Sequence, residues 1–160
     1  MTSAPLDIPE HLFVCIDHVG VAVPDLDEAK RLYTETFGMT VTHEETNEEQ
    51  GVREAMVQVN PHGGDTASQC IQLLAPVSEE STIAKFLDRS GPGLQQLAYR
   101  VTDVEQVSQV LRSRGVRLLY DAPRRGTAGS RVNFVHPKDA GGVLVELVQP
   151  SAVLHSPVPD

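Results

Sequence analysis

Apolar and polar residues follow the same order twice along the chain. Residues 16–26 align without a gap with residues 94–104, and both segments open with the alternation of a half-buried strand. Each segment then places an aspartate, Asp25 or Asp103, where a helix needs an N-terminal cap. The repeat indicates that one structural module, which opens with a strand and a helix, is written twice.

Two helices are predicted next by apolar residues at helical spacing. The apolar stripe covers residues 26–37 in the first copy and 104–111 in the second. A glycine, Gly38 or Gly115, follows each stripe, at the position where helices commonly end.

Short strands follow the helices, and the two copies also end alike. We expect strands at 39–42 and 116–119, and the closing segments 71–76 and 145–150 match each other. Each module therefore contains a strand, a helix and about three further strands. Between the modules, residues from about 78 to 90 predict a linking helix that a Gly-Pro-Gly sequence stops.

The repeat predicts one domain over residues 12–150, with the first module at about 14–76 and the second at about 92–150. Residues 1–11 and 151–160 are expected to be flexible termini. A module of this length buries its sheet better against a partner. Repetition alone therefore predicts a paired sheet and not an activity.

Composition excludes some classes of function. The chain has 160 residues and a formal net charge of -9, which argues against a nucleic-acid binder. No segment has the roughly 20 apolar residues of a membrane span, and the N-terminus lacks the features of a signal peptide. Cys15 and Cys70 lie in apolar stretches, so buried reduced thiols in a cytoplasmic protein are expected.

Four residues with nitrogen or oxygen donors occupy repeat-equivalent positions. His18 and Gln96 lie on the opening strands, and Gln72 and Glu146 lie on the closing strands. Singly, a histidine beside an aspartate or a buried glutamine is commonly structural, so the prediction depends on their joint placement. One nitrogen and three oxygen donors leave two octahedral positions open. This arrangement suits a Co, Mn, Ni or Mg-like divalent ion more than a closed zinc site.

Several segments of the sequence match those of a known protein superfamily, namely 15–19, 47–54, 80–87, 115–121, 136–138 and 141–147. At these stretches the sequence resembles the vicinal oxygen chelate superfamily, which includes glyoxalase I, extradiol dioxygenases and bleomycin-resistance proteins. Within it the sequence is most similar to the methylmalonyl-CoA epimerase family. The resemblance implies a glyoxalase-like α+β fold. In this fold two βαβββ modules pair into a curved eight-stranded mixed sheet around a metal-binding cavity.

The resemblance also implies roles for single residues. The family's metal ligands are His, Gln, His and Glu, which fall on His18, Gln72, Gln96 and Glu146. Gln96 is a departure, because an amide oxygen is a weaker donor to late transition metals than imidazole. The family's acid/base glutamate falls on Glu54, and Glu146 is the candidate for the second acid/base. The implied reaction interconverts (R)- and (S)-methylmalonyl-CoA by removal of the C2 proton, in a homodimeric protein.

A CoA thioester substrate needs cations for its phosphates. A local basic group between residues 123 and 138 runs against the overall charge and consists of Arg124, Arg125, Arg131 and Lys138. We expect these residues to contact phosphate or the substrate carboxylate. The alternative is a solvated basic loop. His136 is a candidate positioning residue within this segment.

Two other functional classes remain open from the sequence. One is another vicinal oxygen chelate enzyme, such as a glyoxalase-like lyase. Extradiol dioxygenases are disfavoured, because their iron site needs two histidines and Gln96 removes one. The other class is a non-enzymatic protein that binds small molecules and needs neither the ligand set nor Glu54. Metal analysis of the purified protein separates these classes.

Overall fold

The computed structural model describes residues 4–59, 61–62 and 69–151. The chain divides into two compact units, one of residues 17–97 and one of residues 1–16 together with 98–160. The strands β1 (Phe13–Ala22) and β5 (Gly93–Val101) contribute residues to both units. Part of the expected flexible termini, residues 1–3 and 152–160, lies outside the described residues.

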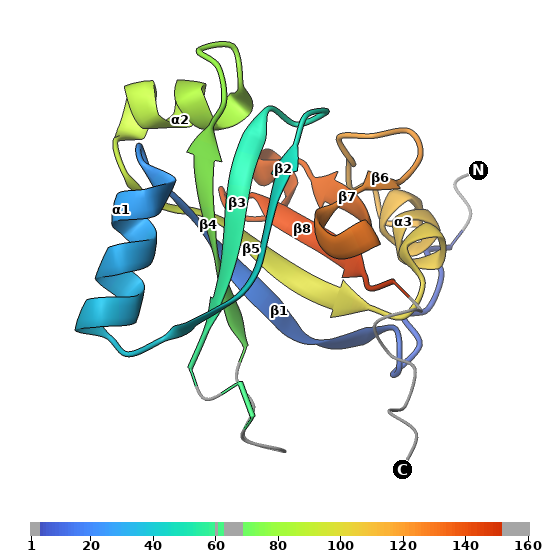
Figure 1. Ribbon diagram of the computed structural model, residues 1–160. Coiled ribbons are helices and arrows are strands. Elements are labelled where there is room, and N and C mark those ends of the chain that lie inside the picture. Colours follow the sequence, from blue (N-terminus) through green and yellow to red (C-terminus); the bar gives the residue numbers. More distant parts are fainter. Residues whose placement is uncertain (1–3, 60, 63–68, 152–160) are drawn as a thin grey trace. The chain divides into compact units, whose positions relative to one another are not determined.

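The unit of residues 17–97 contains the first module and the linking helix (Figure 1). After β1 its elements are α1 (Leu26–Arg31), the π-helical turn η1 (Leu32–Thr36), β2 (Thr40–Asn47), β3 (Val52–Gln58), β4 (Cys70–Pro76) and α2 (Thr82–Ser90). The order of neighbouring strands is β2-β3-β4-β1. β2, β3 and β4 pair antiparallel, whereas β1 and β4 pair in parallel.

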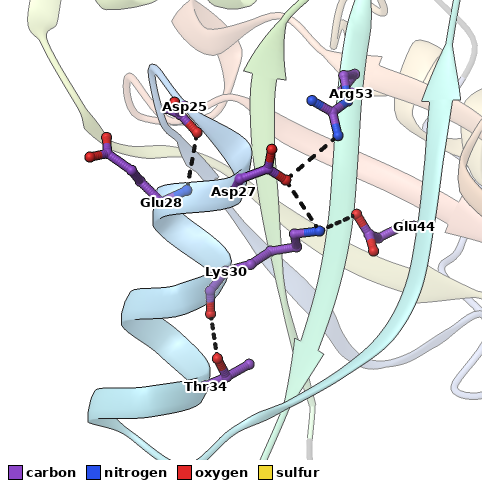
Figure 2. Close-up of polar contacts among 7 residues, drawn as sticks. All are labelled: Asp25, Asp27, Glu28, Lys30, Thr34, Glu44 and Arg53. Atoms are coloured by element: carbon purple, nitrogen blue, oxygen red, sulfur yellow. Dashed lines mark hydrogen bonds and ion pairs between the residues drawn. The ribbon is translucent and has the colours of Figure 1, made fainter.

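The first helix begins where the sequence predicts it. The side chain of Asp25 accepts a hydrogen bond from the backbone N–H of Glu28 at 3.0 Å, which satisfies one of the free donors of the first turn. Figure 2 shows how the helix is then tied to the neighbouring strands. Lys30 Nζ lies 2.7 Å from Glu44 Oε1 on β2 and 3.4 Å from Asp27, and Asp27 lies 3.8 Å from Arg53 on β3. The carboxylate of Glu44 raises the pKa of Lys30 above its usual value.

One face of this unit's sheet is covered by α1. Leu26 and Ala29 pack in one apolar cluster with residues of β3 and β4, namely Ala55, Val57, Leu73 and Ala75. Because side chains alternate along a strand, the residues between these, Glu54 and Gln72 among them, lie on the other face. On that other face Ile83 of α2 packs against Ala22, Val52 and Leu74 near the ends of their strands. Polar side chains, Glu54 and Gln72 among them, occupy the middle of this face of the sheet.

The second unit repeats this arrangement. Its elements are α3 (Val104–Ser113), β6 (Arg124–Arg125), the 3-10 turn η3 (Thr127–Gly129), β7 (Arg131–Val135), the 3-10 turn η4 (Pro137–Asp139) and β8 (Val145–Gln149). Asp103 caps α3 by accepting from two backbone N–H groups. α3 packs on β7 and β8 through valines that contact Val135 and Leu147. Glu146 pairs with Phe134 and, by alternation, lies on the face opposite α3.

These elements confirm the predicted α+β class with eight strands in a mixed sheet. The strand expected at 39–42 begins at Thr40 and is longer than expected, and the linking helix begins at Thr82 because Ser81 caps it. The strand expected at 116–119 is wrong. In that segment Leu118 makes one isolated bridge with Val135. The N–H of Arg117 is bound by the carboxylate of Asp139 instead of a strand carbonyl.

The expected burial of both thiols is also wrong. Cys15 is exposed and Cys70 is half-buried. The apolar start of β1 does not reflect burial within the chain, since Val14 and Ile16 beside Cys15 are 54% and 39% exposed. Within the described residues, none of the helices is long and apolar enough to cross a membrane.

Candidate functional site

Four polar side chains are buried together on the face of the 17–97 unit opposite α1. They are His18 on β1, Glu54 on β3, Gln72 on β4 and Gln96 on β5, each less than 9% exposed. Polar groups buried to this extent cost free energy unless they are hydrogen-bonded. Their partners therefore decide what this cluster can do.

His18 is oriented by the residue before it. Its Nδ1 lies 2.7 Å from Oδ2 of Asp17. This contact orients the ring, and its Nε2 lies 3.3 Å from the amide nitrogen of Gln96. Metal-binding histidines are commonly held in this way by a carboxylate on the far nitrogen.

The two glutamines continue the chain of contacts. Gln96 Nε2 lies 3.3 Å from His18 Nε2 and donates to Gln72 Oε1 at 3.1 Å. Gln72 Nε2 in turn donates to Glu54 Oε2 at 2.8 Å. The network therefore runs from Asp17 through His18, Gln96 and Gln72 to Glu54, and the last contact fixes one oxygen of the Glu54 carboxylate.

Strand pairing explains why these residues meet. In the parallel pair of β1 and β4, Gly20 is the partner of Gln72, and in the antiparallel pair of β3 and β4, Met56 is the partner of Gln72. Glu54 is two residues from Met56, so it is the diagonal neighbour of Gln72 on the same face. Gly20 makes the space for Gln96, because a methyl group there would lie 2.4 Å from Gln96 Cγ.

The structure thus brings together three of the four predicted metal ligands, His18, Gln72 and Gln96. It also places the predicted acid/base residue Glu54 in contact with Gln72. The fourth, Glu146, is buried on β8 in the other unit, and its approach to the other three stays a prediction. Among the described residues, no group of three or more His, Cys, Asp or Glu side chains could hold a metal ion. A site built here would depend on the amide oxygens of the glutamines.

The predicted phosphate contacts lie in different surroundings within the second unit. The guanidinium of Arg124 stacks over the ring of Tyr120 at 3.9 Å, and Arg125 stands opposite Arg131 in the pairing of β6 with β7. Arg131 forms an ion pair with Glu105 on α3. The backbone N–H of Lys138 donates to Nδ1 of His136, so His136 caps the turn that carries Lys138.

His43 and Glu45, for which no role was predicted, lie near Glu54 in the structure. Glu45 on β2 pairs directly with Glu54 on β3, and His43 Nε2 lies 2.5 Å from Glu45 Oε2. The register of β2 shifts between Val41 and His43. Because of this bulge, simple alternation from the start of the strand could not predict which face these residues occupy.

Comparisons to known proteins agree with the fold. A family model of the glyoxalase/bleomycin resistance protein/dioxygenase superfamily matches residues 17–134, and the chain belongs to this superfamily.

Several proteins similar to this chain are methylmalonyl-CoA epimerases. A crystal structure of methylmalonyl-CoA epimerase from Mycobacterium tuberculosis is 53% identical with a TM-score of 0.83, and the match covers 92% of this chain and 95% of that one. A methylmalonyl-CoA epimerase in complex with methylmalonyl-CoA and NH4+ is 47% identical with a TM-score of 0.82, covering 88% and 97%. The ethylmalonyl-CoA/methylmalonyl-CoA epimerase of Cereibacter sphaeroides is 35% identical, covering 84% and 96%.

Proposed function

We propose that this protein is a methylmalonyl-CoA epimerase, an isomerase that interconverts (R)- and (S)-methylmalonyl-CoA through removal and return of the C2 proton. The observation that carries the proposal is the buried network in which Gln72 bonds both Gln96 and the carboxylate of Glu54. In this network a candidate base, Glu54, lies beside two candidate metal ligands. Similarity to epimerases over most of the chain supports the choice of substrate.

The proposal includes a divalent cation. Three of its candidate ligands lie close together, because His18 Nε2 and Gln72 Oε1 are 3.3 and 3.1 Å from the amide nitrogen of Gln96. His18, Gln72, Gln96 and Glu146 would hold the ion, whose identity we place among Co, Mn, Ni and Mg. A divalent ion held there would stabilise the negative charge that develops on the thioester oxygen when C2 loses its proton.

Glu54 is assigned to proton transfer at C2. Its Oε2 accepts a hydrogen bond from the Gln72 amide, which holds the carboxylate in position for proton transfer. Its burial at 2% exposure keeps water away from the carboxylate. Glu146 is assigned to return the proton on the other face of C2. The tail of CoA is assigned to Arg124, Arg125, Arg131 and Lys138, as expected from the sequence.

The proposal includes a homodimeric state and a cytoplasmic location. Exposed apolar side chains near the starts of β1 and β5, Val14 at 54% and Leu94 at 74%, support association between copies of the chain. Sedimentation of the purified protein measures the oligomeric state directly.

The role of Glu54 is tested by replacing Glu54 with Gln. This substitution keeps the shape and the contact to Gln72, and removes the base. We expect C2 deuterium exchange into methylmalonyl-CoA to fall by about 10²-fold or more, because a positioned base contributes that much. A matched control is Glu44→Gln, since Glu44 is partly exposed and is paired with Lys30 instead. Full exchange by the Glu54 variant would remove this residue from the mechanism.

A further inference from the structure

The basic residues assigned to the tail of CoA do not all lie on one face of the sheet. In the pairing of β6 with β7, Arg124 is opposite Val132 and Arg125 is opposite Arg131. Directly paired residues share a face, and neighbours along a strand lie on opposite faces. Arg131 forms its ion pair with Glu105 of α3, so Arg125 and Arg131 lie on the face that α3 covers. Arg124 therefore lies on the other face.

The face that carries Arg124 also carries Glu146. Phe134 is two residues after Val132, and it is the partner of Glu146 in the pairing of β7 with β8. Val132 and Phe134 belong to one apolar cluster, against which Tyr120 packs. Arg124 itself is exposed. It is therefore an exposed cation on the same face of the second unit as the residue assigned to return the proton.

An aromatic ring supports the guanidinium of Arg124. Its Cζ lies 3.9 Å from the centre of the Tyr120 ring, and that ring meets Phe134 edge-on with centroids 5.8 Å apart. Stacking of this kind restricts a long side chain that is otherwise flexible at the surface. Within the described part of the chain Arg124 forms no ion pair. No carboxylate there competes with a ligand for its N–H groups.

The backbone of Tyr120 is held in turn by a buried side chain. Asn133 is fully buried, and its Oδ1 accepts from the N–H of Tyr120 at 3.1 Å while its Nδ2 donates to the carbonyl of Tyr120 at 3.0 Å. The guanidinium of Arg112 donates to the same carbonyl at 2.9 Å. A buried amide that makes these bonds fixes its partner in place. The ring beneath Arg124 is therefore positioned by the interior of the fold.

We propose that Arg124 is the principal contact for a phosphate of the CoA tail, and that Tyr120 positions its guanidinium. The inference rests on the proposed function and narrows its four basic residues to one. A guanidinium can bind a phosphate through two parallel N–H···O bonds. Phosphate is favoured over the malonyl carboxylate because β7 lies between β6 and β8, and two strand spacings amount to about 10 Å. The carboxylate is attached to C2 itself, where Glu146 is assigned to act.

The first experiment measures binding of CoA, which has the phosphates and no malonyl group, to the full chain by calorimetry. We expect Arg124→Gln to weaken binding by about tenfold or more, because a charge-assisted contact is lost. The matched control is Arg89→Gln, which removes the same charge from another exposed arginine over an aromatic ring, that of Phe86. We expect the control to bind CoA like the wild type. Unchanged affinity in Arg124→Gln, an equal loss in the control, or no binding by the wild type would overturn the proposal.

Two further arms separate the possible contacts. Methylmalonyl-pantetheine has the carboxylate and lacks the phosphates, so we expect Arg124→Gln to bind it as tightly as the wild type does. A loss of affinity for this compound would assign Arg124 to the carboxylate and overturn the proposal. Arg131→Gln should lose less CoA affinity than Arg124→Gln, because Arg131 lies on the face of α3 and pairs with Glu105. An equal or larger loss in Arg131→Gln would overturn the choice of Arg124.

The positioning role of Tyr120 is tested with two substitutions. Tyr120→Phe keeps the ring and should keep the wild-type affinity for CoA, whereas Tyr120→Leu should lower it. In the Arg124→Gln background, Tyr120→Leu should add little further loss, because a positioning residue acts through the residue that it positions. Equal losses in the two backgrounds, or a loss in Tyr120→Phe as large as that in Tyr120→Leu, would contradict the role of the ring.

These experiments measure binding and not proton exchange, so the two proposals can fail separately. A protein that binds CoA through Arg124 and does not exchange the C2 proton of methylmalonyl-CoA would contradict the proposed function alone. A protein that catalyses this exchange, and whose Arg124→Gln variant binds CoA with wild-type affinity, would contradict this inference alone.

Discussion

Single residues decide whether the buried network can form. Gly20 is the clearest case, because the space above its Cα is filled by the side chain of Gln96. Gln96 can therefore reach His18 and Gln72 only while residue 20 has no side chain. The sequence shows a small residue at this position, but its role follows only from the pairing of distant strands.

Replacing Gly20 with Ala is expected to destabilise the fold by about 1–3 kcal/mol, the usual cost of overpacking a close-packed interior. The new methyl group would lie 2.4 Å from Gln96 Cγ and displace the Gln96 side chain from its contacts with His18 and Gln72. Urea unfolding measures the loss. The double variant Gly20→Ala with Gln96→Ala removes the clash, so we expect its stability loss to be smaller than the sum of the two single losses. If the stability losses of the two single variants added exactly in the double variant, the clash between residue 20 and Gln96 would not be the cause of the loss.

At the scale of elements, α1 and α3 each cover one face of the sheet in their own unit, and the candidate site residues lie on the opposite face. α1 packs on Ala55, Val57, Leu73 and Ala75, so Glu54 and Gln72 face away from it. α3 packs on Val135 and Leu147, so Glu146 faces away from it. This parity could be predicted from the repeat, because equivalent strands carry equivalent alternation.

The segment after α3 shows where such prediction stops. The pattern at 116–119 is that of a strand, but Arg117 is held by Asp139, twenty-two residues later in the chain. Two side-chain contacts, of 2.9 and 3.0 Å, form a bidentate ion pair. A contact between residues so far apart in the sequence does not appear in the periodicity of apolar residues. It also uses the backbone N–H of Arg117, which a strand would need for pairing.

The same ion pair gives a prediction for pH. The Arg117 side chain and backbone N–H hold the pKa of Asp139 well below its usual range. A lowered pKa adds stability above the unfolded value of about 3.9, and this stability is lost as the pH falls below that value. We expect Arg117→Gln to be less stable than the wild type at pH 7 at low ionic strength, with a difference that shrinks toward pH 3. Urea unfolding across this range measures it.

A suitable control for the pH series is Arg112→Gln. The guanidinium of Arg112 donates to the backbone carbonyl of Tyr120 at 2.9 Å, and that acceptor does not titrate. Its stability loss should therefore stay constant from pH 7 to pH 3. If the stability loss of Arg117→Gln were also constant across this pH range, the Asp139 carboxylate would not be the source of the stability that Arg117 contributes.

For the whole molecule, the repeat in the sequence predicts more of the function than any single motif does. It places His18, Gln72 and Gln96 at positions that the structure brings into contact. The contact of Gln72 with Glu54 could not be predicted, because it depends on the register of β3 with β4.

The central claim is that these residues move the C2 proton of methylmalonyl-CoA at a metal-dependent site. The most direct measurement starts from the (S) isomer in D2O and follows both deuterium at C2 and formation of the (R) isomer. The metal-loaded protein is compared with protein treated with a chelator. We predict that deuterium appears at C2 together with inversion, and that the chelator removes both. Absence of exchange in the metal-loaded protein, or exchange unaffected by the chelator, would contradict the account.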